Sequence, residues 1–293
     1  SNPDFNLNNR KVLYTSLAIV AIPGVVVLMI PDVGSLLVFF AFLMALYREG
    51  LSGWLFGVIF IFAAVFLVSI AVNPLYVVIA ILVIAAIFVF LNFYTIQGNV
   101  MYIIAIVLTV GLLSALSYGS PYILTKLPKH QRERIEVLYK GEKAFRDTSG
   151  YNLLYSKTAI GSGGLVGKGY KQGSVTQGKF VPEQETDYIF CTVGEEWGFI
   201  GSTVLILCYA IFIGRIYYLA ENQKSTFNRV FGYCFASILL IHFAVNLGMV
   251  MGLFPTVGIP LPFFSYGGSS LLAFSIMTFI FFKLNYADKN SLV

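Results

Sequence analysis

Long apolar stretches alternate with short polar breaks along this chain, a pattern that predicts membrane-spanning helices. Each stretch approaches the length of about 20 residues that a helix needs to cross the hydrocarbon core. We expect an all-α polytopic membrane protein with about eight transmembrane helices and no strands. The expected spans are Val12–Ile30, Val33–Tyr47, Trp54–Val72, Leu75–Phe93, Asn99–Tyr118, Ile200–Ala220, Asn228–Gly252 and Phe263–Leu284. The second is short, which indicates a tilted or partly re-entrant helix.

Composition supports this interpretation and excludes a soluble domain. Apolar residues make up 58% of the chain and charged residues 11%, whereas soluble domains hold about 25% charged residues. We therefore expect one integral membrane domain over residues 1–293. It divides into a short start (1–11), the first five spans (12–118), one large loop (119–187) and the last three spans (188–293).

The distribution of basic residues predicts the orientation. Lys and Arg of short loops gather on the cytoplasmic side of a membrane, whereas long loops are translocated largely regardless of charge. Eleven of the 19 basic residues lie in the 119–187 loop. With the N-terminus inside, the other basic residues face the cytoplasm and the large loop faces outward. The cytoplasmic set is Arg10, Lys11, Arg48, Arg215, Lys224, Arg229, Lys283 and Lys289.

The first part of the large loop, residues 125–147, has the spacing of an amphipathic helix. It carries seven basic and four acidic side chains, with Ile135, Leu138 and Tyr139 on one side. One interpretation is a solvated helix held on lipid headgroups by electrostatic attraction. The other is recognition of a phosphate-bearing ligand by Arg132 and Arg134, because a guanidinium binds phosphate oxygens in a bidentate manner.

The stretch from Gly161 to Phe199 is the first candidate for a functional site. It reads GSGGLVGKGYKQGSVTQGKFVPEQETDYIFCTVGEEWGF and is dense in Gly, Lys, Gln and carboxylates. Polar backbone and charge at membrane depth are costly unless they line a cavity or face water. A long polar loop in such a chain is therefore the place to look for function.

Two later motifs, Asn246–Met249 and the segment from Pro260 to Ser269, accompany this stretch. Together they resemble the SEDS family of membrane proteins (shape, elongation, division and sporulation), most closely its RodA-type branch, which acts in elongation. The glycine pair Gly-Ser-Gly-Gly and Gly-Lys-Gly favours that branch over the division-type relatives. The resemblance covers the chain from about Pro31 onward, without the additional N-terminal spans and the Gln-Pro-Ser segment with which the family usually begins. We expect three spans between residues 54 and 118, whereas the family has one span in that place. The matching residues are Ser156-Lys157, Ala159–Gly164, Gly167–Gly169, Gln172-Gly173, Thr176-Gln177, Phe180, Pro182-Glu183, Thr186-Asp187, Ile189-Phe190, Glu195-Glu196, Gly198-Phe199, Asn246–Met249, Pro260–Pro262 and Ser265–Ser269.

The resemblance implies a peptidoglycan glycosyltransferase of the bacterial inner (cytoplasmic) membrane, active in cell elongation and shape. Such an enzyme polymerises lipid II on the outer leaflet, and undecaprenyl diphosphate leaves with inversion at the anomeric carbon. A sugar hydroxyl is a poor nucleophile, so a positioned carboxylate is required as general base. The resemblance assigns that role to Asp187. From spacing alone, the general-base role and a helix-cap role for Thr186 or Asp187 are equally supported.

The leaving diphosphate requires positive charge, since preorganised cations stabilise charge that develops in a water-poor site. Arg132, Arg134, Lys157 and Lys168 are the candidate cations. A divalent cation such as Mg²⁺ or Mn²⁺ is a further possibility, because Mg²⁺ prefers a carboxylate together with substrate phosphates. Glu183, Glu185 or Asp187 would supply the ligand. We expect no organic cofactor and no nucleic-acid partner.

Further polar residues have two interpretations each. Glu195 and Glu196 either keep the start of the sixth span hydrated or line the acceptor groove on the same helical face as Asp187. The Pro255–Ser270 segment is either a connecting loop or a second wall of the site, with Ser265 and Tyr266 bonding sugar or peptide. Asp32 is either a turn or cap residue or part of the family pattern. His242 and Asn246, one turn apart, predict an intramembrane hydrogen-bonding pair.

Two other functions remain open at this stage. A flippase for the same lipid precursor would place ionisable residues near mid-span in an inverted repeat, and the sequence shows no such repeat. A non-catalytic scaffold of the cell-wall machinery would not need Asp187. For the enzyme, the resemblance implies a class B penicillin-binding protein, a transpeptidase, as partner.

Overall fold

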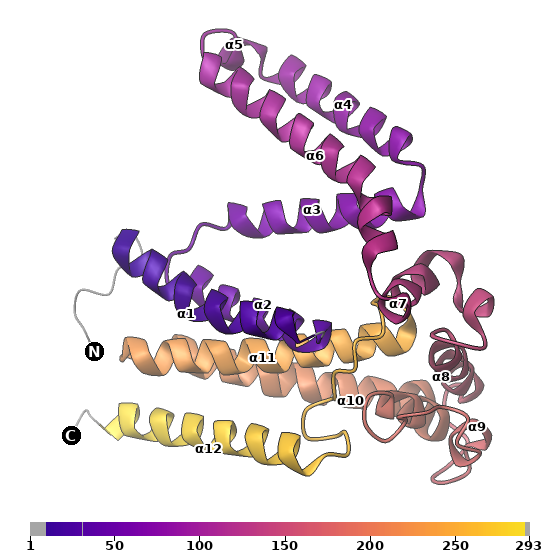
Figure 1. The fold of residues 1–293 in the computed structure, drawn as a ribbon. Coiled ribbons are helices and arrows are strands. Elements are labelled where there is room, and N and C mark those ends of the chain that lie inside the picture. The colour runs from indigo at the N-terminus through magenta and orange to yellow at the C-terminus, as the bar shows by residue number, and fades with distance from the viewer. Residues whose placement is uncertain (1–9, 31, 291–293) are drawn as a thin grey trace. The chain divides into compact units, whose positions relative to one another are not determined.

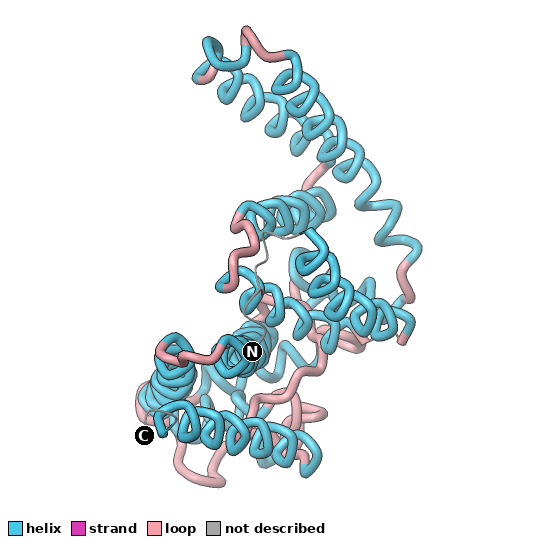
Figure 2. The backbone as a smooth tube through the Cα atoms, turned by 90° about the vertical axis from the view of Figure 1, so that its left-hand side faces the viewer, coloured by secondary structure: helices cyan, strands magenta, loops and turns pink. Residues whose placement is uncertain are grey.

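The computed structural model describes residues 10–30 and 32–290, so the start at 1–9, Pro31 and the last three residues lie outside this account. Helices joined by loops make up the described residues, which include no strand (Figure 2). The expectation of an all-α fold is confirmed. The elements are α1 (Arg10–Met29), α2 (Val33–Arg48), α3 (Trp54–Ala71), α4 (Pro74–Leu91), α5 (Phe93–Ile96), α6 (Val100–Lys126), α7 (Lys129–Lys140), η1 (Glu142–Phe145), α8 (Tyr151–Ser162), α9 (Ser174–Gln177), α10 (Ile189–Glu221), α11 (Thr226–Met251) and α12 (Gly268–Asn290).

Helix length and hydropathy agree with the predicted membrane spans. Among the described residues, six helices are long and apolar enough to cross a membrane: α3, α4, α6, α10, α11 and α12. Two shorter apolar segments, Lys11–Val27 and Gly34–Arg48, coincide with the first two predicted spans. The chain is therefore a polytopic helical membrane protein.

The chain forms two compact units. The first comprises Ser1–Leu51 and Gly141–Val293, and the second comprises Ser52–Lys140. In the second unit α3, α4 and α6 pack on one another, and the buried hydroxyl of Ser69 donates to that of Ser117 at 2.8 Å. Its α6 runs to Lys126, past the predicted end at Tyr118.

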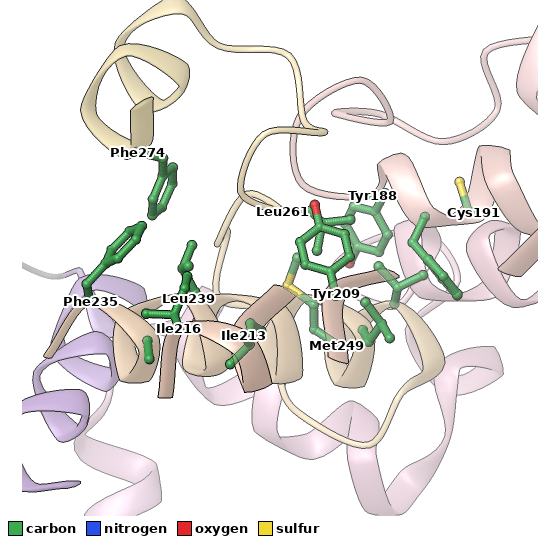
Figure 3. Packing of buried hydrophobic residues seen from close by; sticks show 14 of the residues in the cluster. Tyr188, Cys191, Tyr209, Ile213, Ile216, Phe235, Leu239, Met249, Leu261 and Phe274 are labelled. Carbon is green, nitrogen blue, oxygen red and sulfur yellow. The ribbon is translucent and has the colours of Figure 1, made fainter. Parts of the chain in front are cut away.

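In the first unit, α10 and α11 lie side by side, with α2 packed on α11 and α8 packed on both (Figure 1). Their buried side chains form the core, to which Tyr188, Tyr209 and Met249 contribute. Leu261 comes from the non-helical segment between α11 and α12 and belongs to the same cluster (Figure 3). The buried hydroxyl of Tyr209 donates to the carbonyl of Pro262. The core therefore holds this irregular segment in place.

Charged side chains tie α2, α10 and α11 together at one end of the first unit. Arg229 donates from Nε and a terminal nitrogen to Glu49 at 2.7 and 3.0 Å. Arg48 bonds both carboxylate oxygens of Glu221, with Nε at 2.8 Å from Oε2. Bidentate pairs of this kind are directional as well as strong. They fix the mutual orientation of the three helices.

Candidate functional site

A break in α10 organises the candidate site. The helix begins at Ile189, two residues after Asp187, rather than at Ile200 as predicted, and Gly198 interrupts it with a φ of 62°. A Cβ atom at Gly198 would lie 2.3 Å from the backbone nitrogen of Gly167. Only glycine accommodates both this φ and this close approach.

The glycine loop, residues Gly163–Gly169, supplies the backbone hydrogen bonds that the broken helix lacks. A helix end leaves carbonyls and amides without intrahelical partners, and irregular backbone in a membrane protein is stable only where such groups are bonded or face water. The loop therefore completes the helix at its break. The four bonds run from Lys168 N to Glu195 O (3.0 Å), from Gly169 N to Glu196 O (3.0 Å), from Phe199 N to Gly164 O (2.9 Å) and from Ile200 N to Leu165 O (3.0 Å).

The carboxylate of Glu195 is fully buried and is bound by the glycine loop and by the start of α9. Its Oε1 accepts from Lys168 Nζ at 2.7 Å and from Val175 N at 3.0 Å, and its Oε2 accepts from Thr176 N at 2.8 Å. The structure thus pairs Glu195 of α10 with Lys168 of the glycine loop. Glu196 is also buried, with 5% of its surface exposed, so neither glutamate keeps the start of the helix hydrated.

A polar pocket of about 290 Å³ lies at the turn that precedes Asp187. Glu183 has a φ of 54°, and its carbonyl accepts from the backbone amides of Thr186, Asp187 and Tyr188. The opposite wall belongs to the Pro255–Tyr266 segment, which is joined to the turn by the bond from Tyr266 N to Glu185 O at 2.8 Å. The pocket is lined by Lys179, Val181, Pro182, Glu183, Gln184, Glu185, Thr186 and Tyr266.

Asp187 is half-buried at the junction between this turn and α10. Tyr188 occupies the N-cap position of α10, and the hydroxyl of Thr186 donates back to Glu183. Gly258, with a φ of +69°, passes so close that a Cβ there would lie 3.2 Å from Oδ2 of Asp187. The aspartate is therefore held between the start of α10 and the Pro255–Tyr266 segment.

The predicted pair of His242 and Asn246 is wrong in its partners. His242 Nδ1 lies 3.2 Å from the carbonyl of Pro260. The amide nitrogen of Asn246 donates to Asp187 O at 2.8 Å and to Ile259 O at 2.7 Å, and its carbonyl oxygen has no partner within the described residues. Both side chains thus bind the backbone around the candidate site instead of each other.

Other predicted site residues are not among those that line the pocket. Ser265 is buried, and its hydroxyl accepts from Leu261 N at 2.8 Å inside its own turn. Lys157 on α8 pairs with Glu142 at 3.3 Å. Arg132 and Arg134 lie on α7 in the second unit, where Arg132 is 3.7 Å from Glu136. The predicted amphipathic helix over 125–147 is present as α7, which spans Lys129–Lys140.

Asp32 is a helix cap in this structure. Its carboxylate accepts from the backbone amide of Ser35 at 3.0 Å and from the hydroxyl of the same residue at 2.5 Å. These two hydrogen bonds favour the charged form and lower the pKa of Asp32 below its ordinary value. The cap interpretation of this residue is confirmed.

The donor set does not form a closed metal site. Within the described residues, no group of three His, Cys, Asp or Glu side chains is arranged to hold a metal ion. Glu183, Glu185 and Asp187 therefore fit a divalent cation only in the manner of Mg²⁺, which binds one or two carboxylates together with substrate phosphates.

Lys179, Asn246 and Gly258 contribute to the site, although the sequence analysis assigned none of them a binding or catalytic role. Lys179 was one of many cations in the large loop, and nothing in the local sequence separates it from Lys171. For Asn246 the sequence did contain a signal. An asparagine within the apolar run of α11 predicts a buried amide, and a buried amide requires hydrogen-bond partners. Its true partners lie in distant segments.

Comparison with known proteins agrees with this architecture. Residues 61–290 match the FtsW/RodA/SpoVE family, described as cell cycle proteins. The peptidoglycan glycosyltransferase MrdB of Escherichia coli K12 is 43% identical over 143 residues, covering 49% of this chain and 38% of that protein. RodA of Treponema pallidum is 32% identical over 58% of this chain and 40% of its own length. A probable peptidoglycan glycosyltransferase FtsW of Coxiella burnetii is 34% identical over 64% and 48%.

The chain thus spans less than half the length of these curated relatives. The similar solved structures include two that resemble this chain over most of its length. A peptidoglycan synthase complex that coordinates polymerization and crosslinking has a TM-score of 0.47 at 23% identity, covering 96% of this chain and 98% of that one. A RodA variant from Thermus thermophilus has a TM-score of 0.36 at 20% identity, covering 79% and 97%. Because the family match extends over most of its residues, this chain belongs to the FtsW/RodA/SpoVE family.

Proposed function

We propose that this chain is a peptidoglycan glycosyltransferase that polymerises lipid II, with Asp187 as general base. One observation carries the proposal: a half-buried aspartate directly follows the turn that lines a polar pocket, and a close-lying glycine segment confines its carboxylate. Family membership and the names of the relatives, peptidoglycan glycosyltransferases, support the same activity.

In the proposed reaction, the C4 hydroxyl of the acceptor's GlcNAc attacks the anomeric carbon of the donor's MurNAc. Asp187 accepts the hydroxyl proton as the new bond forms, which is general base catalysis. Undecaprenyl diphosphate leaves from the opposite face, so the configuration at that carbon inverts. Confinement beside Gly258 limits the positions that the carboxylate can take and thereby orients it toward the acceptor.

Lys179 is the cation that lines the pocket, together with Glu183, Glu185 and Tyr266. An ammonium group stabilises the negative charge that develops on a departing diphosphate. Lys168 is less suited to this task, since Glu195 already binds it at 2.7 Å. We therefore assign the leaving-group role to Lys179. Glu183 or Asp187 would hold a divalent cation, and such an ion would supply further positive charge for the departing diphosphate; this remains a prediction.

The proposed setting is the bacterial cytoplasmic membrane, with the loop over 119–187 outside and a class B penicillin-binding protein as partner. The excess of basic residues in the short loops on the other side supports this orientation. Lipid II that has reached the outer leaflet would then meet the pocket directly.

The test uses labelled lipid II and the purified chain, with and without a class B penicillin-binding protein. Formation of glycan polymer with release of undecaprenyl diphosphate supports the proposal. A parallel assay in vesicles measures transfer of labelled lipid II between leaflets. Transfer without polymer would favour a flippase, and lipid II binding with neither activity would favour a scaffold.

A further inference from the structure

Asn246 is a polar side chain in the apolar helix α11, and none of its surface is exposed. Burying an amide destabilises a protein unless the amide forms hydrogen bonds. Two short bonds satisfy its nitrogen, to Asp187 O at 2.8 Å and to Ile259 O at 2.7 Å. Since both partners are carbonyls, only the NH₂ end of the side chain can face them, which fixes the orientation of the amide.

The two acceptors belong to the two segments that meet at the Asp187 carboxylate. One is the backbone carbonyl of Asp187 itself. The other belongs to Ile259, the residue after Gly258, which approaches the Asp187 carboxylate closely. A single amide thus joins the backbone of the aspartate to the segment that its side chain faces.

We infer that Asn246 is a positioning residue of the active site, whose amide clamps the Asp187 turn to the Ile259 segment and so fixes the direction of the Asp187 carboxylate. This inference rests on the proposed function of Asp187. The carbonyl oxygen of Asn246 is buried without a partner within the described residues, which lowers stability. The two donated bonds, rather than good packing of the whole side chain, therefore account for an amide at this place.

Two other bonds hold the same segment without the Asn246 amide. The hydroxyls of Tyr188 and Thr256 share a hydrogen bond of 2.9 Å, and Tyr266 N donates to Glu185 O at 2.8 Å. Loss of the Asn246 amide would leave these bonds in place, so the segment remains docked while Asp187 gains freedom. A displacement of about 1 Å at a catalytic group lowers turnover by about 100-fold.

The experiment compares Asn246→Ala and Asn246→Ser with the parent and with Ser237→Ala. Ser237 is a matched control because it is fully buried on the same helix and shares a hydrogen bond of 2.8 Å with the Tyr217 hydroxyl, within the helical part of the unit. The measurements are kcat and KM for lipid II polymerisation, the Tm, and backbone amide hydrogen exchange over residues 183–190 and 255–262.

We expect kcat to fall by about 100-fold in Asn246→Ala and by less in Asn246→Ser, which retains one donor, while KM and the binding of lipid II change little. Hydrogen exchange should rise in both segments in the Asn246 variants and in neither segment in Ser237→Ala. A kcat equal to that of Ser237→Ala at the same loss of Tm would overturn the positioning role, as would unchanged exchange in the two segments. If Asn246→Ala does not fold, Asn246→Ser decides by the same criteria.

Hydrogen exchange separates this inference from the proposed function. If the parent forms no polymer, the proposed function fails, and the positioning role fails with it. The exchange measurement would still show whether Asn246 clamps the two segments. If the parent forms polymer and Asn246→Ala does so at the parental kcat, the proposed function stands and only the inference is wrong.

Discussion

The ammonium of Lys168 lies 2.7 Å from Oε1 of Glu195, and the glutamate side chain is fully buried while 28% of the lysine side chain is exposed. The same carboxylate accepts two backbone amides from the start of α9. The pair therefore binds three parts of the polar stretch together: the glycine loop, α9 and the first half of α10. All three precede or flank the turn that carries Asp187.

Glu195→Gln should lower the free energy of unfolding by about 3 kcal/mol, because the buried side chain loses its charged bond to Lys168 and one of its two acceptor oxygens. Glu142→Gln is the control: its partner Lys157 is 3.3 Å away and 44% exposed, so a loss of about 0–1 kcal/mol is expected. Thermal unfolding in one detergent measures both. Equal losses in the two variants would contradict the role given to Glu195.

Gly198→Ala should prevent the glycine loop from docking, since the added Cβ would overlap the backbone of Gly167 and the residue would have to adopt a positive φ. Gly214→Ala is the matched control in the same helix, where a Cβ meets no atom within 4 Å. That change should stabilise the protein by about 0.5–1 kcal/mol. Limited proteolysis within residues 163–179 reports loop docking, and a Gly198→Ala protein as resistant as the parent would refute this account of the break.

The cap at Asp32 predicts a pH dependence. Hydrogen bonds from Ser35 lower the pKa of this carboxyl in the folded protein, so its contribution is present above the unfolded value of about 3.9 and is lost as the pH falls through the lower folded value. Asp32→Ala should cost about 1 kcal/mol at neutral pH. The difference in Tm from the parent should persist down to about pH 4 and then shrink. A difference that is constant with pH would exclude this explanation.

Lys179→Gln should reduce polymerisation by about 10-fold or more, because the pocket loses the cation that would face the departing diphosphate. Lys171→Gln is the control. Both lysines are exposed in the same loop and have a positive φ, but Lys171 does not line the pocket. Initial rates with lipid II at saturation measure the effect. If both variants lose the same activity, general charge attraction explains it and the specific role of Lys179 does not hold.

Hydropathy alone predicted most of the helical framework. Membrane spans are long apolar runs with clear ends, which is why the eight predicted stretches correspond to helices in the structure. The start of α10 was missed because the run from Ile189 to Gly198 contains two glutamates and two glycines, which resemble a polar loop. That run is helical because the glycine loop bonds its exposed backbone groups, a long-range effect that no local pattern shows.

The candidate site was predicted in part. Glu183, Thr186 and Tyr266 line one pocket beside Asp187, and their roles toward a substrate stay predictions. Lys168 and Ser265 were predicted to bind the substrate. In the structure Lys168 pairs with Glu195, and the hydroxyl of Ser265 accepts from the Leu261 amide. Which cation reaches a pocket depends on how a long loop folds, and a count of charges along the sequence does not contain that information.

The most direct test of the central claim is glycan polymerisation from lipid II by Asp187→Asn beside Asp147→Asn. Asp147 is an exposed aspartate of the same large loop and serves as the matched control. The account predicts polymer from the parent and from Asp147→Asn, and none from Asp187→Asn, with all three proteins folded and binding lipid II equally. Polymer from Asp187→Asn at the parental rate would show that Asp187 is not the general base.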